Sequence, residues 1–473
     1  MRKSRIVLLF CVVAIVGGSL YLWNNDFLFA KKAPTEELAV VDELYSIISQ
    51  QSVYDTTSNV LVEGALRGMA SAIKDPYSTY YSEQEAAIHR QSLASERVGI
   101  GVELAETHGK FVIVSPVKDS PAEQAGVRPL DEIVQIDDER LDGKTMGDVM
   151  RLMQGKIGQK VTLVLYRPQA ERHIKLTIER AALKNETVEA AVIERAEESF
   201  GYLSLSMFGE KTAEEWKNAV AEVEKSDVQG WIVDVRDNPG GYLHSVAEII
   251  STLENRERIF AYMQNNTGAL EPLATKPEQI ASLTKPIVIL QNEGSASASE
   301  VFAAAMQAWE RATIIGNTSF GKGTVQKSWE LQNGGEVKLS TNKWLTPTKD
   351  WIHGKGVLPD IEVKQHPLFA LEMMPLVGTF KQGDFSEEIA YVQNVLNELG
   401  YSVARQDGFF DEETAEVVQQ FRKKHNLIAG EELEESFFAA LQKEALSYKE
   451  KPEHDLQLEM AISFLLHELD SRK

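Results

Sequence analysis

The spacing of apolar residues changes several times along the chain, and each change indicates a different kind of structure. A mostly apolar, uncharged stretch runs from Ile6 to Trp23, close to the roughly 20 residues that a membrane-spanning helix needs. Between 36 and 73 apolar residues recur at helical spacing in two runs, which predicts two packed helices. Between about 97 and 180 short β-branched runs alternate with Gly, Pro and Asp clusters, which predicts a small β-rich domain.

The second half of the chain has a different pattern. From 198 to 365 apolar strands alternate with helical runs, which is typical of an α/β domain whose sheet is buried behind helices. A looser stretch from His366 to Gly383 precedes a compact helical unit that ends near 445. The tail after 452 again has helical spacing, with apolar residues at Leu456, Met460, Phe464 and Leu465.

Length, charge and cysteine content narrow the possibilities. With 473 residues the chain is too long for one ordinary hydrophobic core, so several domains are expected. The net charge of -22 opposes a large interface with nucleic acid, because such interfaces need clustered Lys and Arg. Cys11 is the single cysteine, which excludes an intramolecular disulfide and a zinc site built on cysteines.

Basic residues precede the N-terminal apolar stretch. Arg2, Lys3 and Arg5 form a positive flank, which keeps that end of a spanning helix in the cytoplasm. Leu28 is too large for the small-residue pattern of a signal-peptide cleavage site. We therefore predict an uncleaved anchor in residues 1–30, with the rest of the chain outside the cytoplasmic membrane. A cleaved signal peptide, which would release a secreted protein, is the alternative.

A serine-rich segment, Asn292–Glu300, follows an apolar strand and opens an Ala-rich helix. Unpaired N–H groups and the helix dipole at such a start favour a developing oxyanion, and Ser297 is the candidate nucleophile. The alternative is local, since Ser297 and Glu300 have the spacing of a capping box that only stabilises the helix. On this segment alone, the capping box is the simpler interpretation.

Lys322 lies between Gly321 and Gly323 in the next polar segment. A lysine acts as a general base only when it is neutral, and burial favours the neutral amine. If the segment were helical, Gln326 would share a face with Lys322 and orient its amine, although the glycines argue against a helix. The alternative is a solvated loop lysine, as most lysines are.

A third segment, Trp231–Gly241, is an apolar strand that ends in a turn with two glycines. The N–H groups of Gly240 and Gly241 are candidate oxyanion donors, together with that of Ala298. The alternative is a tight turn without a catalytic role.

Together these segments resemble the carboxy-terminal processing peptidases, or tail-specific proteases, a serine-lysine family, and are most similar to its CtpB branch. The motifs occur in the family's order and spacing: Asp75–Tyr80, Asp234–Gly241, Gly294–Glu300, Ser319–Gln326 and Gly354–Asp360. The resemblance implies an α/β core of the ClpP/crotonase type that needs no metal or other cofactor. It also implies that Ser297 is the nucleophile, Lys322 the base and Gln326 the residue that orients this base.

The β-rich segment resembles the PDZ domains of bacterial proteases, through Ser120–Gly126 and Leu130–Ile133. Its carboxylate-binding loop is matched by Gly99, Ile100, Gly101 and Val102. Such loops hold a C-terminal carboxylate while the peptide adds as a strand, so the resemblance implies protein substrates recognised at their C-termini. Leu130 replaces the usual Gly, and Gln154 stands where many relatives have Arg, so switching by this domain is expected to differ here.

The helical unit Gly383–Leu441 resembles a peptidoglycan-binding-like domain, which implies a possible contact with the cell wall. The alternative is that its motif residues only pack three helices. The apolar stripes in 36–73 and in the tail predict a homodimer, because large exposed stripes usually mark interfaces. Each stripe folding back on its own subunit is the alternative.

The predicted fold class is therefore multidomain α+β: a PDZ β-domain, an α/β peptidase core, and helical N- and C-terminal segments. The predicted boundaries are 1–30 for the cytoplasmic tip and anchor, 34–92 for an N-terminal helical segment, 93–182 for the PDZ domain, 183–366 for the peptidase core, 380–446 for the peptidoglycan-binding-like domain and 450–473 for a C-terminal helix.

Two other functions remain open at this point. A Ser-His hydrolase is the nearest enzymatic alternative, although the chain has no Gly-x-Ser-x-Gly elbow and only His244 lies close to the glycine turn. A catalytically inactive adaptor, which binds proteins through its PDZ domain and also binds the cell wall, is the other alternative.

Overall fold

A computed structural model describes residues 36–93, 96–107, 109–117, 120–128, 131–167, 172–184, 186–278, 280–371, 374 and 378–472. The predicted anchor in residues 1–30 lies outside these ranges. Within them, no helix is both long enough and apolar enough to cross a membrane. The chain divides into two compact units, Met1–Ser82 and Glu83–Lys473.

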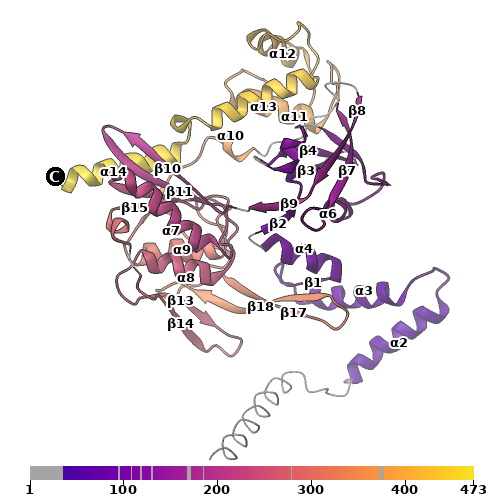
Figure 1. Ribbon diagram of the computed structural model, residues 1–473, viewed down its shortest axis with the longest axis horizontal. Helices are drawn as coiled ribbons and strands as arrows, with labels where there is room; N and C mark the ends of the chain where they lie inside the picture. Colours follow the sequence, from indigo (N-terminus) through magenta and orange to yellow (C-terminus); the bar gives the residue numbers. More distant parts are fainter. Residues whose placement is uncertain are drawn as a thin grey trace, which may run out of the picture. The chain divides into compact units, whose positions relative to one another are not determined.

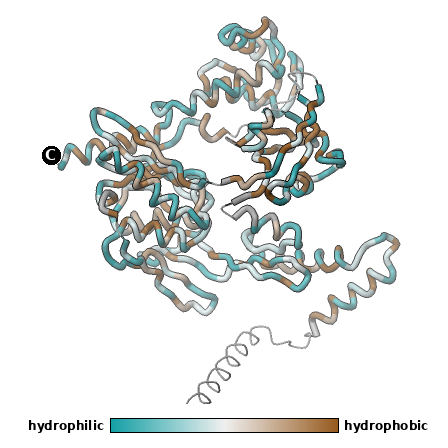
Figure 2. Tube along the Cα trace, in the orientation of Figure 1, coloured by the Kyte–Doolittle hydropathy of each residue, from teal (hydrophilic) through white to brown (hydrophobic). Residues whose placement is uncertain are grey.

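The first unit contains the two helices that the periodicity predicts, followed by a short strand: α2 (Glu36–Gln51), α3 (Ser58–Ser71) and β1 (Thr79–Tyr81). The Thr57 side chain accepts a hydrogen bond from the backbone N–H of Val60 and so caps the start of α3. Hydrophobic and hydrophilic residues alternate along α2 (Figure 2). Many apolar side chains of these helices are exposed: Leu38, Val40, Val41, Leu44, Ile47, Val60, Val62 and Met69.

The second unit begins with α4 (Glu83–Leu93) and the β-rich domain. The domain's sheet has the order β3-β4-β5-β7-β8, with β6 paired to β5. Its strands are β3 (Val102–Thr107), β4 (Lys110–Pro116), β5 (Glu132–Ile136), β6 (Glu139–Arg140), β7 (Lys160–Arg167) and β8 (Arg172–Glu179). Two helices, α5 (Pro121–Gln124) and α6 (Met146–Met153), complete it (Figure 1). Strands β2 (Glu96–Gly99) and β9 (Ala181–Lys184) pair with each other at the two ends of the domain.

A buried ion pair fixes the end of β7 in this domain. Arg167 donates two hydrogen bonds of 2.7 Å to the carboxylate of Asp131, which is fully buried just before β5. The guanidinium also donates to the carbonyl of Gly126 at 2.8 Å. A buried carboxylate is stable only when its oxygens are hydrogen-bonded, so Asp131 ties the Ser120–Gly126 motif to the sheet.

The α/β domain is built on a six-stranded sheet with the order β10-β11-β12-β15-β16-β19. Its strands are β10 (Val188–Arg195), β11 (Glu198–Leu205), β12 (Gly230–Asp234), β15 (Ile287–Gln291), β16 (Thr313–Gly316) and β19 (Ile361–Glu362). All neighbours are parallel except β10 and β11. Every residue of β12 and β15 is buried, as expected for parallel strands that are covered on both faces.

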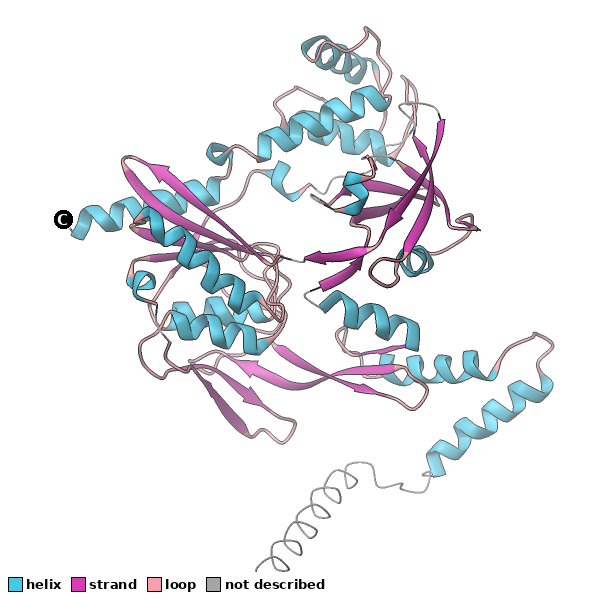
Figure 3. Cartoon of the chain, viewed as in Figure 1, coloured by secondary structure: helices cyan, strands magenta, loops and turns pink. Residues whose placement is uncertain are grey.

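Different helices cover the two faces of this sheet (Figure 3). Trp231 and Val233 of β12 pack into a cluster with α7 (Thr212–Val223), α8 (Leu243–Thr252) and α9 (Ala298–Ala308). Ile232, on the other face of the same strand, packs against the C-terminal helix α14 (Leu456–Arg472). The alternation follows from the two-residue period of a strand.

The C-terminal helix corrects the prediction made for the tail. Its buried residues are Gln457, Leu458, Ala461, Ile462 and Leu465, and four of these pack on the sheet. Of the four residues in the predicted stripe, Leu465 is buried and Phe464 is partly buried against the sheet, whereas Leu456 and Met460 are 47% and 39% exposed. The tail therefore folds back on its own subunit, because burying its inner face covers strands that would otherwise be exposed to water.

The remaining elements form a second sheet and a helical domain. Strands β13 (Ile259–Gln264), β14 (Leu270–Ala274), β17 (Thr324–Glu330) and β18 (Glu336–Leu345) pair antiparallel in the order β14-β13-β18-β17. Beyond the short α10 (Pro367–Ala370), the helical domain consists of α11 (Glu387–Glu398), α12 (Glu412–Lys424) and α13 (Glu435–Lys449) around a separate core. The side chains of Ser386 and Asp411 cap the first two of these helices.

Candidate active site

Three loops meet at one edge of the six-stranded sheet. They follow β12, β15 and β16, which are neighbouring parallel strands, so the carboxyl ends of these strands lie side by side. This edge is where open α/β sheets place their ligands. The loops contain the three segments in which the sequence places Gly240, Ser297 and Lys322.

Hydrogen bonds join the first two loops directly. The Ser295 hydroxyl donates to the carbonyl of Val235 at 2.7 Å, and the Ser299 hydroxyl donates to that of Asn238 at 2.9 Å. The backbone N–H of Ala296 also donates to the Asn238 carbonyl, at 3.0 Å. The Asn238 side chain is itself buried and donates to the carbonyl of Leu205 at 2.8 Å. The glycine turn therefore has a fixed position relative to the serine segment.

Ser297 lies at the start of α9 in an unusual backbone conformation, with φ 54° and ψ −109°. A non-glycine residue in such a region costs about 1–3 kcal/mol and persists only where its surroundings enforce it. Gly240 lies against it, and a Cβ at Gly240 would come within 2.9 Å of both Ser297 Cβ and Ala298 N. Only glycine fits there, so the glycine turn and the serine are held in close contact.

Glu300 connects the serine segment to the lysine segment. Its carboxylate is fully buried and accepts four hydrogen bonds. One oxygen accepts from the N–H groups of Ser297 at 2.7 Å and Lys322 at 2.8 Å. The other accepts from the Ser319 hydroxyl and the Gly321 N–H, both at 2.6 Å. The predicted capping contact with Ser297 N–H is present, but the same carboxylate also holds the backbone of the candidate base.

Further contacts fix the backbone around Lys322. The indole N–H of Trp344 donates to the Lys322 carbonyl at 2.8 Å, and that of Trp351 donates to the Gly323 carbonyl at 2.8 Å. His353 Nδ1 accepts a hydrogen bond from the Gly323 N–H at 3.3 Å, and the His353 ring stacks on Trp351. The sequence did not indicate that Trp344, Trp351 and His353 contact this segment. Trp344 lies in β18 and the other two follow that strand, so all three are distant from Lys322 in the sequence.

Gln326 lies on strand β17, so the helical arrangement considered for it is absent. Its amide nitrogen donates to the hydroxyls of Thr324 at 3.0 Å and Ser340 at 3.1 Å. Lys322 precedes this strand, and a shift in the β17–β18 register between Val325 and Gln326 interrupts the regular alternation of side chains there. The His244 ring stacks on Tyr242, and among the described residues no hydrogen bond joins it to the Ser297 hydroxyl.

The three candidate oxyanion donors differ in their contacts. The Gly240 N–H already donates to the Asn238 side-chain oxygen at 2.9 Å. The N–H groups of Gly241 and Ala298 have no hydrogen-bond partner among the residues that the structure describes. Phe208 holds this turn, since its N–H donates to the Gly240 carbonyl and its carbonyl accepts from the Tyr242 N–H.

The predicted peptide-binding loop of the β-rich domain is well ordered by its own contacts. Gly101 has φ 80°, and a Cβ at this position would be 2.3 Å from Ser120 Cβ. The Ser120 hydroxyl donates to the Gly101 carbonyl at 3.1 Å, and the Ala122 N–H donates to the Ile100 carbonyl at 2.8 Å. Ile100 is buried in the domain core, whereas Val102 is only partly buried. Of the two apolar side chains in this loop, that of Val102 is the more accessible.

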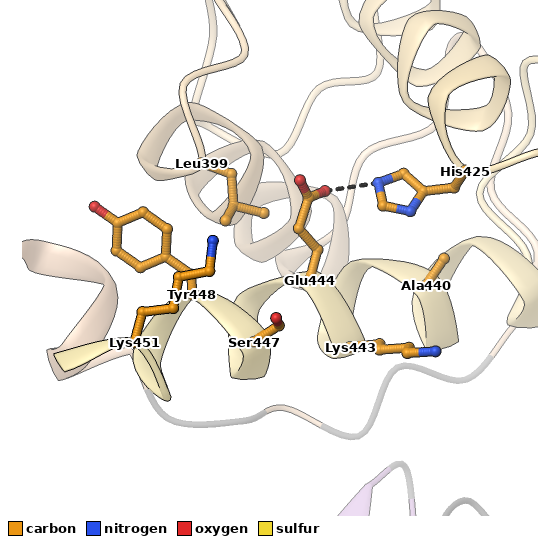
Figure 4. Close-up of a pocket in the computed structure, with 8 residues that line it drawn as sticks. All are labelled: Leu399, His425, Ala440, Lys443, Glu444, Ser447, Tyr448 and Lys451. Atoms are coloured by element: carbon orange, nitrogen blue, oxygen red, sulfur yellow. Dashed lines mark hydrogen bonds and ion pairs between the residues drawn. The ribbon is translucent and has the colours of Figure 1, made fainter. Parts of the chain in front are cut away.

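A separate polar pocket lies in the C-terminal helical domain (Figure 4). Its volume is about 480 Å³, and most of its lining residues belong to α13. The full lining consists of Leu399, His425, Ala440, Lys443, Glu444, Ser447, Tyr448 and Lys451. Glu444 is bonded to His425 and Lys424, each at 2.8 Å. Burial alone would raise the pKa of Glu444, but the hydrogen bonds from Lys424 and His425 lower it below its usual range. The carboxylate is therefore charged, and it holds the Lys424 ammonium and the His425 ring in place.

Comparisons with known proteins agree with this organisation. Residues 199–363 match the model of peptidase family S41, 112–167 match a PDZ domain, 25–85 match the N-terminal domain of the activating protease CtpB, and 386–429 match a putative peptidoglycan binding domain.

Two relatives from Bacillus subtilis (strain 168) are similar over most of their length. The carboxy-terminal processing protease CtpB is 35% identical over 429 residues, which are 90% of this chain and 88% of the relative. The carboxy-terminal processing protease CtpA is 32% identical, with 99% of this chain and 100% of the relative covered. Among solved structures, the photosystem II D1 C-terminal processing protease is 25% identical, with a TM-score of 0.45 over 70% of this chain and 94% of that one.

The family models and the two Bacillus relatives confirm the predicted fold class, with a PDZ domain and an α/β peptidase core. They also confirm that a peptidoglycan-binding-like domain is present. The chain belongs to peptidase family S41, as a serine protease of the carboxy-terminal processing type with a PDZ domain.

Proposed function

We propose that Ser297 is the nucleophile of this protease and that Lys322 is its general base. The observation that carries the proposal is the Glu300 carboxylate, one oxygen of which accepts the backbone N–H groups of both residues. A nucleophile and a base must be held at a fixed separation to act together, and a shared buried acceptor provides this constraint. The strained backbone of Ser297 supports the same assignment.

The reaction proceeds by acyl transfer. The neutral Lys322 amine takes the proton of the Ser297 hydroxyl, and the serine oxygen attacks the carbonyl carbon of the scissile peptide. The N–H groups of Gly241 and Ala298 stabilise the negative oxygen of the tetrahedral intermediate, since the N–H of Gly240 is engaged with Asn238. The Lys322 ammonium protonates the leaving amine, and water then hydrolyses the acyl-enzyme.

Gln326 orients the lysine in this mechanism. Because Thr324 and Ser340 hold its amide nitrogen, its carbonyl oxygen can accept a hydrogen bond from the lysine amine. The chain's own residues provide all the groups that the reaction requires, so no metal or organic cofactor is involved in the proposed mechanism.

Removal of either member of the dyad tests this assignment. Ser297→Ala and Lys322→Ala are each expected to lower kcat/KM on an unstructured protein by at least about 1,000-fold, because residues that act as one unit each carry most of the effect. His244→Ala is the control and is expected to remain active. Full proteolysis by either dyad variant, or loss of proteolysis in the histidine variant alone, would contradict the proposal and favour a Ser-His mechanism.

Glu300 gives a second test. Glu300→Gln preserves the shape of the side chain. The NH₂ group of the glutamine, however, faces two of the four groups that donate to the carboxylate. Each buried donor left unsatisfied lowers the free energy of unfolding by about 1–3 kcal/mol. We expect a lower melting temperature and a fall in kcat/KM of about 100-fold, as for a misplacement of roughly 1 Å.

The matched control for this variant is Glu293→Gln. Glu293 lies in the same segment, is exposed, and accepts one hydrogen bond from Asn317. Its substitution is expected to leave both readouts unchanged. Equal activity of the Glu300 and Glu293 variants at a temperature where both are folded would show that Glu300 does not position the dyad.

We also propose that the substrates are proteins outside the cytoplasm, and that the PDZ domain recognises their C-termini. The loop Gly99–Val102 offers backbone N–H groups for a carboxylate next to the edge strand β3, where a peptide can add as a strand. The proposal extends to anchoring of the chain in the bacterial cytoplasmic membrane by residues 1–30. Release of the chain from washed membranes without detergent would contradict that anchor.

Recognition of the carboxylate has a direct test. Amidation of a peptide with an apolar last residue removes the negative charge, so its affinity for the protein is expected to fall at least about tenfold when measured by fluorescence anisotropy. A peptide that is amidated on a side chain far from its C-terminus is the control. Equal affinity of the free-acid and C-terminally amidated peptides would contradict C-terminal recognition while leaving the peptidase assignment intact.

A homodimer formed through α2 and α3 is a further part of the proposal. The first unit exposes a group of apolar side chains, which a second copy of the same unit can cover with the same face. The C-terminal helix is not part of this interface, because its buried apolar side packs on its own sheet.

The dimer proposal is tested by light scattering on a chain that lacks residues 1–30. This chain is expected to be dimeric at micromolar concentration, and the double variant Leu44→Lys/Ile47→Lys on α2 is expected to be monomeric, because two charges would be buried at the interface. Ile428→Lys is the control, since Ile428 is an apolar residue of the C-terminal domain that is even more exposed than Leu44 and Ile47. A monomeric parent chain, or a dimer that persists in the α2 variant, would refute this interface.

Contact with peptidoglycan is proposed for the C-terminal domain, at the pocket formed mainly by α13. Its Lys443, Lys451 and His425 offer positive and hydrogen-bonding groups, and peptidoglycan stem peptides carry carboxylates. Cosedimentation with purified cell-wall sacculi provides the test. Equal cosedimentation of the parent chain and of Lys443→Glu/Lys451→Glu would exclude this pocket as the contact.

A further inference from the structure

The loop that carries the glycine turn is bonded to the far C-terminal end of the chain. Arg236 lies in this loop, just after β12. It donates two hydrogen bonds to the carboxylate of Asp455, at 2.9 Å and 2.8 Å, and further hydrogen bonds to Asp234, the shortest at 2.6 Å. Asp455 lies outside residues 199–363, which match the family S41 model.

Asp455 is itself firmly positioned. It is 7% exposed and immediately precedes α14, where its side chain accepts a hydrogen bond from the Leu458 N–H at 3.0 Å. Gln365 donates to it at 2.6 Å. The neighbouring Gln457 accepts a hydrogen bond from Arg236 at 3.2 Å and donates to the Val363 carbonyl at 2.8 Å. The start of α14 is therefore a built polar site that receives the guanidinium.

The electrostatics of this site require both carboxylates. Burial would lower the pKa of Arg236, but the charges of Asp234 and Asp455 outweigh burial and raise it. Burial would likewise raise the pKa of Asp455, and the hydrogen bonds and charge of Arg236 lower it below its usual value. Tyr202 also donates to Asp234 at 2.7 Å. A buried guanidinium that loses one of its two carboxylates is drawn toward the other or toward water, so the loop no longer has a single position.

The loop passes this position on to the active site. The carbonyl of Val235, next to Arg236, accepts a hydrogen bond from the Ser295 hydroxyl. The carbonyl of Asn238 accepts hydrogen bonds from the Ser299 hydroxyl and the Ala296 N–H. The glycine turn follows directly and contacts Ser297. A chain of direct contacts therefore runs from Asp455 through Arg236 to the oxyanion donors and the nucleophile.

We propose that Asp455 is a positioning residue of the protease, and that α14 completes the active site from outside the family S41 segment. This inference rests on the proposed function of Ser297. The helix has a second, apolar attachment to the sheet through Leu458, Ala461, Ile462 and Leu465. Substitution of Asp455 thus removes the tie to the loop while the helix stays docked.

The test uses the full chain with the single variant Asp455→Asn. Asparagine preserves the shape but removes the charge that holds Arg236. The matched control is Glu459→Gln, which removes the ion pair of the same helix with Arg195 on β10, a strand that contributes no site loop. Four quantities are measured for each chain: kcat on an unstructured protein, KM on the same protein, the rate at which a fluorophosphonate modifies Ser297, and the melting temperature.

We expect Asp455→Asn to lower kcat and the rate of modification at least about tenfold, with KM within about twofold of the parent value, because a displaced loop weakens stabilisation of the transition state more than binding. Glu459→Gln is expected to match the parent chain in all four quantities. A folded Asp455→Asn that is modified at the parent rate, with or without a lower melting temperature, would show a merely structural role and overturn the proposal.

Modification of the parent chain by the fluorophosphonate tests the role of Ser297 separately from the role of Asp455. Ser297→Ala is included to show that the fluorophosphonate reacts at Ser297. If the parent chain is not modified, or if Ser297→Ala is modified equally, the proposed function of Ser297 fails, and the role of Asp455 fails with it. If the parent is modified at Ser297 but Asp455→Asn behaves identically, only the role of Asp455 is refuted.

Discussion

The buried carboxylate of Glu300 is the constraint on which the rest of the active site depends. A charge removed from water is tolerable only when hydrogen bonds replace its hydration, and here four donors do so. Two of these donors are the backbone N–H groups of Ser297 and Lys322. The requirement to satisfy one carboxylate therefore sets where two separate loops lie, and the stability of the fold and the geometry of the site have the same cause.

Buried carboxylates are satisfied by guanidinium groups elsewhere in the chain. Arg167 pairs with Asp131 in the β-rich domain, and Arg236 pairs with both Asp234 and Asp455. Each guanidinium binds through more than one nitrogen, which fixes direction as well as distance. In a chain with a net charge of -22, such pairs use carboxylates to specify contacts between distant segments, whereas most of the other acidic residues remain on the surface.

The physical unit of the peptidase is larger than the segment that its family model matches. Residues 199–363 supply the six-stranded sheet apart from β10 and the first residue of β11, together with the helices on one of its faces. The other face is covered by α14 from the end of the chain. Gly230 of β12 lies close to α14, since a Cβ at Gly230 would be 3.1 Å from the side chain of Leu465. In the sequence, the helical domain of α11, α12 and α13 lies between residues 199–363 and α14. It is therefore an insertion within the peptidase, because the segments before and after it both belong to the peptidase core.

The sequence by itself determined the family, the order of the motifs and the class of each element, because periodicities of two and 3.6 residues and short motifs are local properties. The sequence could not show that Glu300 does more than cap a helix. Three of the four hydrogen-bond donors to its carboxylate are Ser319, Gly321 and Lys322, which lie about 20 positions after Glu300 in the sequence. The sequence placed Gln326 conditionally on a helix, whereas pairing with β18 makes that segment a strand. In the tail, helical spacing indicated an apolar stripe, but only packing against β15 and β16 selected Leu458, Ala461 and Ile462 as its buried face. These outcomes depend on contacts between segments distant in sequence, which the tertiary structure alone decides.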